Sequence, residues 1–214
     1  MIENYDALTV GKYEEIERVQ REYGEDDVNG RNLAILLILA DISTDELLDM
    51  KVPAFRAMMD RAAFLRRPLR PAPVLKHYKL GDMTLRPVAD IEKMTTAQYI
   101  DFQTFAKAPD GRIAELLSCF LLPDGHRYND GYDIREVQGA IRALLPITAA
   151  HGLLAFFFRK SQRSMINTLR SLAKTLGRAK KKDARMTEAT MLLNTSILSL
   201  IAGDGCRTST PLLR

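Results

Sequence analysis

The spacing of apolar side chains in residues 1–66 predicts a series of short helices. Across residues 10–23 the apolar positions recur every three or four residues, which places them on one helical face. Residues 28–40 are apolar nearly all round in their second half, as is typical of a helix at the centre of its region. Ser43 and Glu46 have the spacing of a capping box that opens another helix. Pro53 suits the first turn of a further one, where no N–H is needed.

The next stretch predicts an extended linker followed by a hairpin. Prolines occupy three of the seven positions in 67–73, which blocks helix and strand alike and favours an extended spacer. Residues 74–80 and 83–88 then flank Gly81-Asp82, a two-residue turn of the kind found in type II′ hairpins. We therefore expect one small β-hairpin near residues 74–88, packed on helices because a lone hairpin is marginally stable.

Beyond the hairpin the pattern is again helical. A capping box formed by Thr95 and Gln98 opens one helix, another is predicted over 113–122, and Asp133 caps a third. A last amphipathic helix is predicted over 186–202. The expected fold is mainly α, with several helices and one hairpin, arranged as an acidic helical region at 1–66, the 67–73 linker, a hairpin-plus-helix region at 74–203 and a flexible tail at 204–214.

The longest helix is predicted from Pro146 to about Leu176. With successive residues ~100° apart, its apolar side chains gather on one face and are predicted to be buried: Leu154, Phe158, Met165, Leu169, Leu172 and Leu176. Phe157 is assigned to the core as well. Basic side chains on the other side, and just beyond the helix, form the candidate partner-binding face: Arg159, Lys160, Arg163, Arg170, Lys174, Arg178, Lys180, Lys181 and Lys182.

Charge is divided unevenly along the chain. Residues 1–60 hold 14 acidic and 6 basic side chains, a net charge of −8, whereas the rest hold 13 and 25, a net charge of +12. The total of +4 conceals this division. Opposite charges suit docking of the two regions, head-to-tail self-association or an acidic partner. The plainer alternative is that both charged faces are solvated and have no partner.

The sequence offers little to catalysis. His77, His126 and His151 have no triad or metal-ligand spacing, and no CxxC or HExxH motif occurs. Cys119 lies in an apolar run and is predicted to be a core residue rather than a nucleophile. The chain's two cysteines exclude a disulfide framework and fit a reducing compartment. We expect no enzyme activity, no metal and no cofactor.

Neither a signal peptide nor a membrane span is predicted. The N-terminus lacks a basic region followed by an apolar run. The most apolar stretches, residues 33–40 and 144–158, are shorter than the ~20 residues that a span requires. Both are interpreted as buried helices, and no membrane partner is expected.

Four segments of the chain, taken in order, resemble a family of proteins from tailed bacteriophages and prophages of gut bacteria. They are LTVGKYEEI at 8–16, MTTAQYIDFQTF at 94–105, HRYNDGYDIREVQGAIR at 126–142 and AFFFRKSQRSM at 155–165. The likeness spans roughly residues 8–176, with a similar linker and hairpin between the segments. The family is that of the tail assembly chaperones encoded just before the tape measure protein.

The resemblance implies a helical, non-enzymatic protein in the cytoplasm of the infected bacterial host. Its partner there would be the long helical tape measure protein, around which tail tube protein polymerises during virion morphogenesis. Some members of such families are also made as a longer frameshifted form, and this chain would correspond to the short form. An apolar groove beside charged rims would hold partner helices through anchors at i, i+3 and i+4.

Two other functions remain open on the sequence. A structural virion component, such as a connector or a packaged internal protein, would be found in purified particles. A nucleic-acid-binding protein would place the basic face on phosphates, and its binding would weaken as salt is added.

Overall fold

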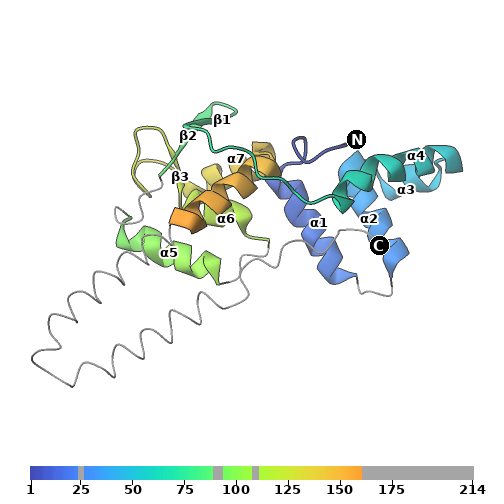
Figure 1. Ribbon diagram of the computed structural model, residues 1–214, viewed down its shortest axis with the longest axis horizontal. Helices are drawn as coiled ribbons and strands as arrows, with labels where there is room; N and C mark the ends of the chain where they lie inside the picture. Colours follow the sequence, from blue (N-terminus) through green and yellow to red (C-terminus); the bar gives the residue numbers. More distant parts are fainter. Residues whose placement is uncertain (24–26, 89–93, 108–110, 161–214) are drawn as a thin grey trace, which may run out of the picture. The chain divides into compact units, whose positions relative to one another are not determined.

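A computed structural model describes residues 1–23, 27–88, 94–107 and 111–160 (Figure 1). These residues belong to one compact unit, made of helices and one small sheet. Its elements are α1 (Val10–Glu22), α2 (Val28–Ala40), α3 (Thr44–Leu48), α4 (Val52–Ala62), the 3-10 helix η1 (Ala63–Arg66), β1 (Tyr78–Leu80), β2 (Met83–Pro87), α5 (Thr96–Ala106), α6 (Ile113–Ser118), β3 (Leu121–Pro123) and α7 (Ile134–Leu144). A further helix, orange in Figure 1, is described over residues 147–160 and is called helix 147–160 below. The mainly α fold is as predicted.

The N-terminal helices form where the apolar spacing and the caps predict them. At the start of α3 the Ser43 hydroxyl accepts a hydrogen bond from Glu46 N at 3.2 Å, and the Glu46 carboxylate accepts one from Ser43 N at 2.7 Å. These two bonds complete the predicted capping box. Pro53 lies in the first turn of α4, also as predicted.

The sheet has one strand more than the sequence predicts. β1 and β2 form the expected antiparallel hairpin, and Gly81 has the positive φ of 61° that a type II′ turn needs at its first central residue. β3 then pairs antiparallel with the other edge of β2, so that Leu122 lies opposite Arg86. The predicted helix over 113–122 therefore ends at Ser118 in α6. Pairing with the edge of β2 supplies backbone hydrogen bonds to this segment, and both of its consecutive leucines are buried there.

The chain just before α1 pairs with the turn that precedes helix 147–160. Thr9 forms an antiparallel bridge with Pro146. On either side of the bridge, Val10 N donates to the Leu145 carbonyl at 2.9 Å and Ile147 N donates to the Leu8 carbonyl at 2.8 Å. This pairing holds the start of α1 against the start of helix 147–160. Around it α1, α6 and α7 pack together over fully buried side chains that include Leu8, Ile16, Leu117 and Ile141.

Residues 67–73 are extended, as their prolines predict, and lie against helix 147–160. Ala72 N donates a hydrogen bond to the Thr148 carbonyl at 2.9 Å. One turn further along, a Cβ at Gly152 would overlap the carbonyl oxygen of Ala72. The division of the chain into regions at this segment stays a prediction. The elements predicted beyond residue 160, including the 204–214 tail, lie outside the described residues.

Candidate protein-binding surfaces

The predicted basic face falls mostly outside the described residues. Arg159 and Lys160 are described, and both are exposed at the end of helix 147–160. Arg159 Nε donates to the Ala155 carbonyl of its own helix at 3.0 Å, and Lys160 Nζ lies 5.8 Å from the centre of the Phe156 ring, within cation–π range. The remaining candidates lie outside the described residues and stay predictions: Arg163, Arg170, Lys174, Arg178, Lys180, Lys181 and Lys182.

The buried face of helix 147–160 differs by one residue position from the face that the sequence predicts. Leu153 and Phe157 are buried, whereas Phe158 is 42% exposed and Leu154 is only partly buried. The prediction for Phe157 is confirmed and that for Phe158 is wrong. The reason lies in a distant contact: the Phe157 ring stacks on Phe120, with ring centroids 4.2 Å apart, and this contact sets the inward face of the helix.

The helix α5 presents an uncharged outer face. Its inner face is anchored, because the predicted Thr95–Gln98 capping box forms and Gln98 Nε2 donates to the Cys119 carbonyl at 2.5 Å. On the outer side Tyr99 is 48% exposed and Ile100 is 57% exposed. The α5 surface, as it is called below, consists of six exposed or partly exposed uncharged residues: Thr96, Ala97, Tyr99, Ile100, Gln103 and Thr104.

Aromatic rings link α5 to helix 147–160, whose last turn lies close to α5 in Figure 1. The Phe102 ring of α5 meets Phe120 edge-on at 5.1 Å, and Phe120 stacks in turn on Phe157. Residues 158–160, which follow Phe157, are all exposed. An uncharged patch with tyrosine and isoleucine, near an exposed phenylalanine and two cations, has the composition of a protein-binding surface.

The turn between α3 and α4 exposes apolar side chains among carboxylates. Leu48 is 71% exposed and Val52 is 61% exposed, although Leu47, which precedes Leu48 in α3, is buried. Residues 41–50 contain four carboxylates and no basic side chain, and all four carboxylates are exposed. The α3–α4 surface is defined by these apolar and acidic residues: Asp41, Asp45, Glu46, Leu48, Asp49 and Val52.

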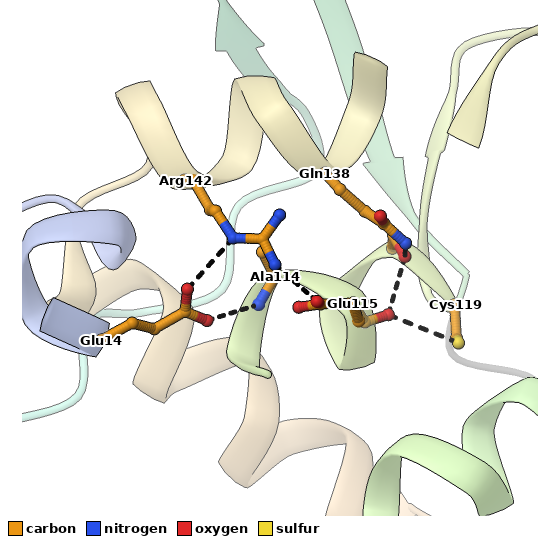
Figure 2. Close-up of polar contacts among 7 residues, drawn as sticks. Glu14, Ala114, Glu115, Cys119, Gln138 and Arg142 are labelled. Carbon is orange, nitrogen blue, oxygen red and sulfur yellow. Dashed lines mark hydrogen bonds and ion pairs between the residues drawn. The ribbon is translucent and has the colours of Figure 1, made fainter. Parts of the chain in front are cut away.

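One ion network joins α1, α6 and α7 (Figure 2). Arg142 donates from Nε to Glu14 at 3.1 Å and from Nη2 to Glu115 at 2.5 Å. The other oxygen of the Glu14 carboxylate accepts from Ala114 N at 3.2 Å, so a side chain of α1 caps the first turn of α6. Burial raises the pKa of Glu14, while the Ala114 N–H and the Arg142 guanidinium act in the opposite direction. The shared cation ties α1, α6 and α7 together as a structural clamp, although Glu115 Oε2 is buried without a hydrogen-bond partner among the described residues.

The groups that could perform chemistry are dispersed. His77 precedes β1, His126 lies in the loop after β3 with Nδ1 2.9 Å from the Asp130 carbonyl oxygen, and His151 lies in helix 147–160, where burial lowers its pKa. Within the described ranges no group of three His, Cys, Asp or Glu side chains could hold a metal ion. A shallow depression beside the ion network is lined by side chains of both signs: Glu14, Glu15, Arg18, Arg21, Arg112 and Arg142.

The thiol of Cys119 is expected to be unreactive in the folded protein. Cys119 is fully buried, as predicted, and burial raises the pKa of its thiol to about 12, so almost no thiolate is present at pH 8. In a Cys206→Ser variant, where Cys119 is the one remaining cysteine, a thiol reagent at pH 8 should titrate about one thiol only after denaturant is added. A Cys119→Ala variant reports the reaction of Cys206 alone. Rapid labelling of native Cys206→Ser protein would contradict the expectation.

Comparison of the chain with protein-family models, curated proteins and solved structures found no match. In the part of the chain that the structure describes, no helix is both long enough and apolar enough to cross a membrane.

Sequence reasoning did not single out the α5 surface or the α3–α4 surface. The sequence does contain a signal for the α5 surface. Residues 94–106 carry a single charged side chain, Asp101, whereas a solvated helix normally has several. A signal for the second was the acidic run at 41–50. Spacing alone could not reveal that Leu48 and Val52 stay exposed, because this depends on which elements cover them.

Proposed function

We propose that the chain is a non-enzymatic tail assembly chaperone of a tailed bacteriophage, which binds helical segments of the tape measure protein in the cytoplasm of the infected host. The observation that supports this most is the uncharged α5 surface, with Tyr99 and Ile100 about half exposed. It lies within residues 94–105, one of the segments that carry the family resemblance.

A partner helix would lie along α5 and bury its apolar stripe there. Thr96, Tyr99, Ile100 and Gln103 recur at the i, i+3, i+4 and i+7 spacing that brings side chains onto one helical face. Arg159 and Lys160, on the neighbouring helix, would pair with carboxylates on the rim of the partner helix. The capping box, Gln98 and Phe102 hold α5 in place beforehand, which lowers the entropy that binding costs.

The size of this surface fits a temporary contact. A patch of six helical residues is smaller than the roughly 20–30 residues a side of a stable protein interface. Each contact is therefore weak by itself. Several chaperone molecules would bind one tape measure chain and together cover its apolar stripes. Tail tube protein could displace them one at a time, which is what polymerisation around the tape measure protein requires.

A double substitution in the α5 surface tests this function. When the tape measure protein of the phage that encodes this chain is co-expressed with it, we expect the tape measure protein to remain soluble. Tyr99→Ala with Ile100→Ala should weaken binding about tenfold or more, since central aromatic and aliphatic anchors carry most of the energy of such contacts. The measurements are the soluble fraction and the affinity in a pull-down titration.

The matched control is Leu75→Ala, which removes a 56% exposed leucine outside the α5 surface and should leave binding unchanged. A tape measure protein that is equally insoluble with and without the chain would argue against the proposal. Recovery of the chain in stoichiometric amounts from purified particles would instead favour a structural virion component. Salt-sensitive binding to DNA or RNA, without an effect on the tape measure protein, would favour the nucleic-acid alternative.

A further inference from the structure

The α3–α4 surface has no role in the function proposed above, yet it bears the two most exposed large apolar side chains of the described residues. These are Leu48 and Val52. α4 is held against the core by the packing of Phe55, Met58 and Met59. Asp45 and Asp49 form no ion pair with any described residue, and Asp41 pairs with Lys12 at 3.2 Å while remaining largely exposed. This surface therefore offers apolar area and free negative charge together.

The same chain contains a segment of complementary chemistry. Residues 163–182 hold seven basic side chains and no acidic one. Met165, Leu169, Leu172 and Leu176 recur within it at the i, i+4, i+7 and i+11 spacing of an amphipathic helix. A basic amphipathic segment of this kind matches the apolar and acidic side chains of the α3–α4 surface in both charge and hydrophobicity.

We propose that the α3–α4 surface binds residues 163–182 of a second copy of this chain. Leucines and the methionine of the segment cover Leu48 and Val52, and its lysines and arginines pair with the carboxylates of residues 41–50. This inference concerns the chain by itself and does not depend on the tape measure protein.

The course of helix 147–160 favours a second copy over the same chain. The helix starts beside Leu8 and Ala72 and proceeds toward α5, where Phe157 stacks on Phe120. Figure 1 shows α5 and the end of this helix on one side of α1, and α3 and α4 on the other. The chain thus leaves the described unit at the end remote from the α3–α4 surface. A second copy can present its segment there without that constraint.

Such a contact joins two different surfaces, so it is heterologous. After one contact forms, the pair still has one free surface, on one copy, and one free segment, on the other, so assembly continues into a ring or an open chain. Because the carboxylates of the α3–α4 surface are exposed, the association should weaken strongly between about 0.05 M and about 0.5 M salt. Self-association would also keep apolar side chains covered until a partner is present.

Charge reversal in the full-length chain tests the contact by sedimentation velocity over a concentration series. The wild type should associate at low salt. Asp45→Lys with Asp49→Lys, and separately Lys174→Glu with Arg178→Glu, should each weaken association about tenfold or more. An equimolar mixture of the two variants should associate again, because the unaltered segment of the first meets the unaltered surface of the second. Leu48→Ala should weaken wild-type association, whereas Leu144→Ala, at a leucine 49% exposed elsewhere, should not.

A control variant with the same change in net charge, Asp130→Lys with Glu136→Lys, alters exposed acids outside the α3–α4 surface and should associate like the wild type. The proposal is overturned if the wild type is monomeric at every concentration. The α3–α4 surface would then bind a segment of the same chain or another protein. It is equally overturned if either reversed variant associates normally or if mixing fails to restore association. Each of these results would contradict self-association alone and would not bear on the proposed binding of the tape measure protein to the α5 surface.

Discussion

Replacing Gly152 by alanine should destabilise the protein by about 2 kcal/mol or more, a large effect for the addition of one methyl group. The new Cβ would overlap the carbonyl oxygen of Ala72, and the contact is with backbone, which cannot rotate away as a side chain can. Either residues 67–73 must lift off helix 147–160 or the helix must shift. Denaturant unfolding, with the midpoint and slope compared to the wild type, measures the loss.

The chain supplies a matched control for this substitution. Gly139 is also helical, in α7, but it is exposed and a Cβ there would meet nothing within 4 Å. Gly139→Ala should therefore stabilise the protein by roughly 0.5–1 kcal/mol, because alanine loses less backbone freedom in a helix. Equal effects of the two substitutions would show that residues 67–73 act as a free linker in solution rather than a segment packed on helix 147–160.

Replacing Arg142 by methionine should cost about 2 kcal/mol at neutral pH. Methionine keeps most of the apolar stem but leaves Glu14 and Glu115 without their shared cation. Breaking a fully buried ion pair costs roughly 3–5 kcal/mol, and the figure is reduced here because the Arg142 side chain is 36% exposed. The fitting control is Arg135→Met in the same helix, where the side chain is exposed and the expected change is within about 0.5 kcal/mol.

The pH dependence of the Arg142→Met effect identifies its cause. Burial already raises the pKa of Glu14 above its ordinary 4.5, and loss of Arg142 removes a group that lowers it. An acid whose pKa is higher in the folded state contributes stability below its unfolded pKa and loses that contribution as the pH rises through the folded value. The deficit of the variant should thus shrink as the pH falls toward 4.5. A deficit that does not change with pH would mean that the loss comes from packing alone.

Much of the fold could be predicted because its signals are local. The capping boxes at Ser43 and Thr95 form as predicted, since each joins groups three residues apart. The glycine at position 81 likewise identified the hairpin turn, because a positive φ is easy only for glycine. Such features depend on neighbours in the chain and hardly on what packs against them.

The candidate surfaces were less accessible to sequence reasoning. The basic face was singled out by its charge, and the structure describes two of its members, Arg159 and Lys160. The α5 surface could not be predicted because residue spacing puts Tyr99 and Phe102 on one apolar side of the helix, whereas Tyr99 is 48% exposed and Phe102 is 8% exposed. Exposure is set by the whole arrangement of neighbours, so residue spacing cannot supply it.

Helix starts, chain turns and the division into acidic and basic regions follow from the sequence, because short-range hydrogen bonds and composition suffice for these. Tertiary contacts were needed to make residues 121–123 a third strand, to turn Phe157 rather than Phe158 inward, and to bring Glu14 to Arg142 from 128 positions away. Each of these outcomes depends on surfaces that are distant in the chain and meet only after folding. Their energies come from burial and pairing between elements, which no local pattern records.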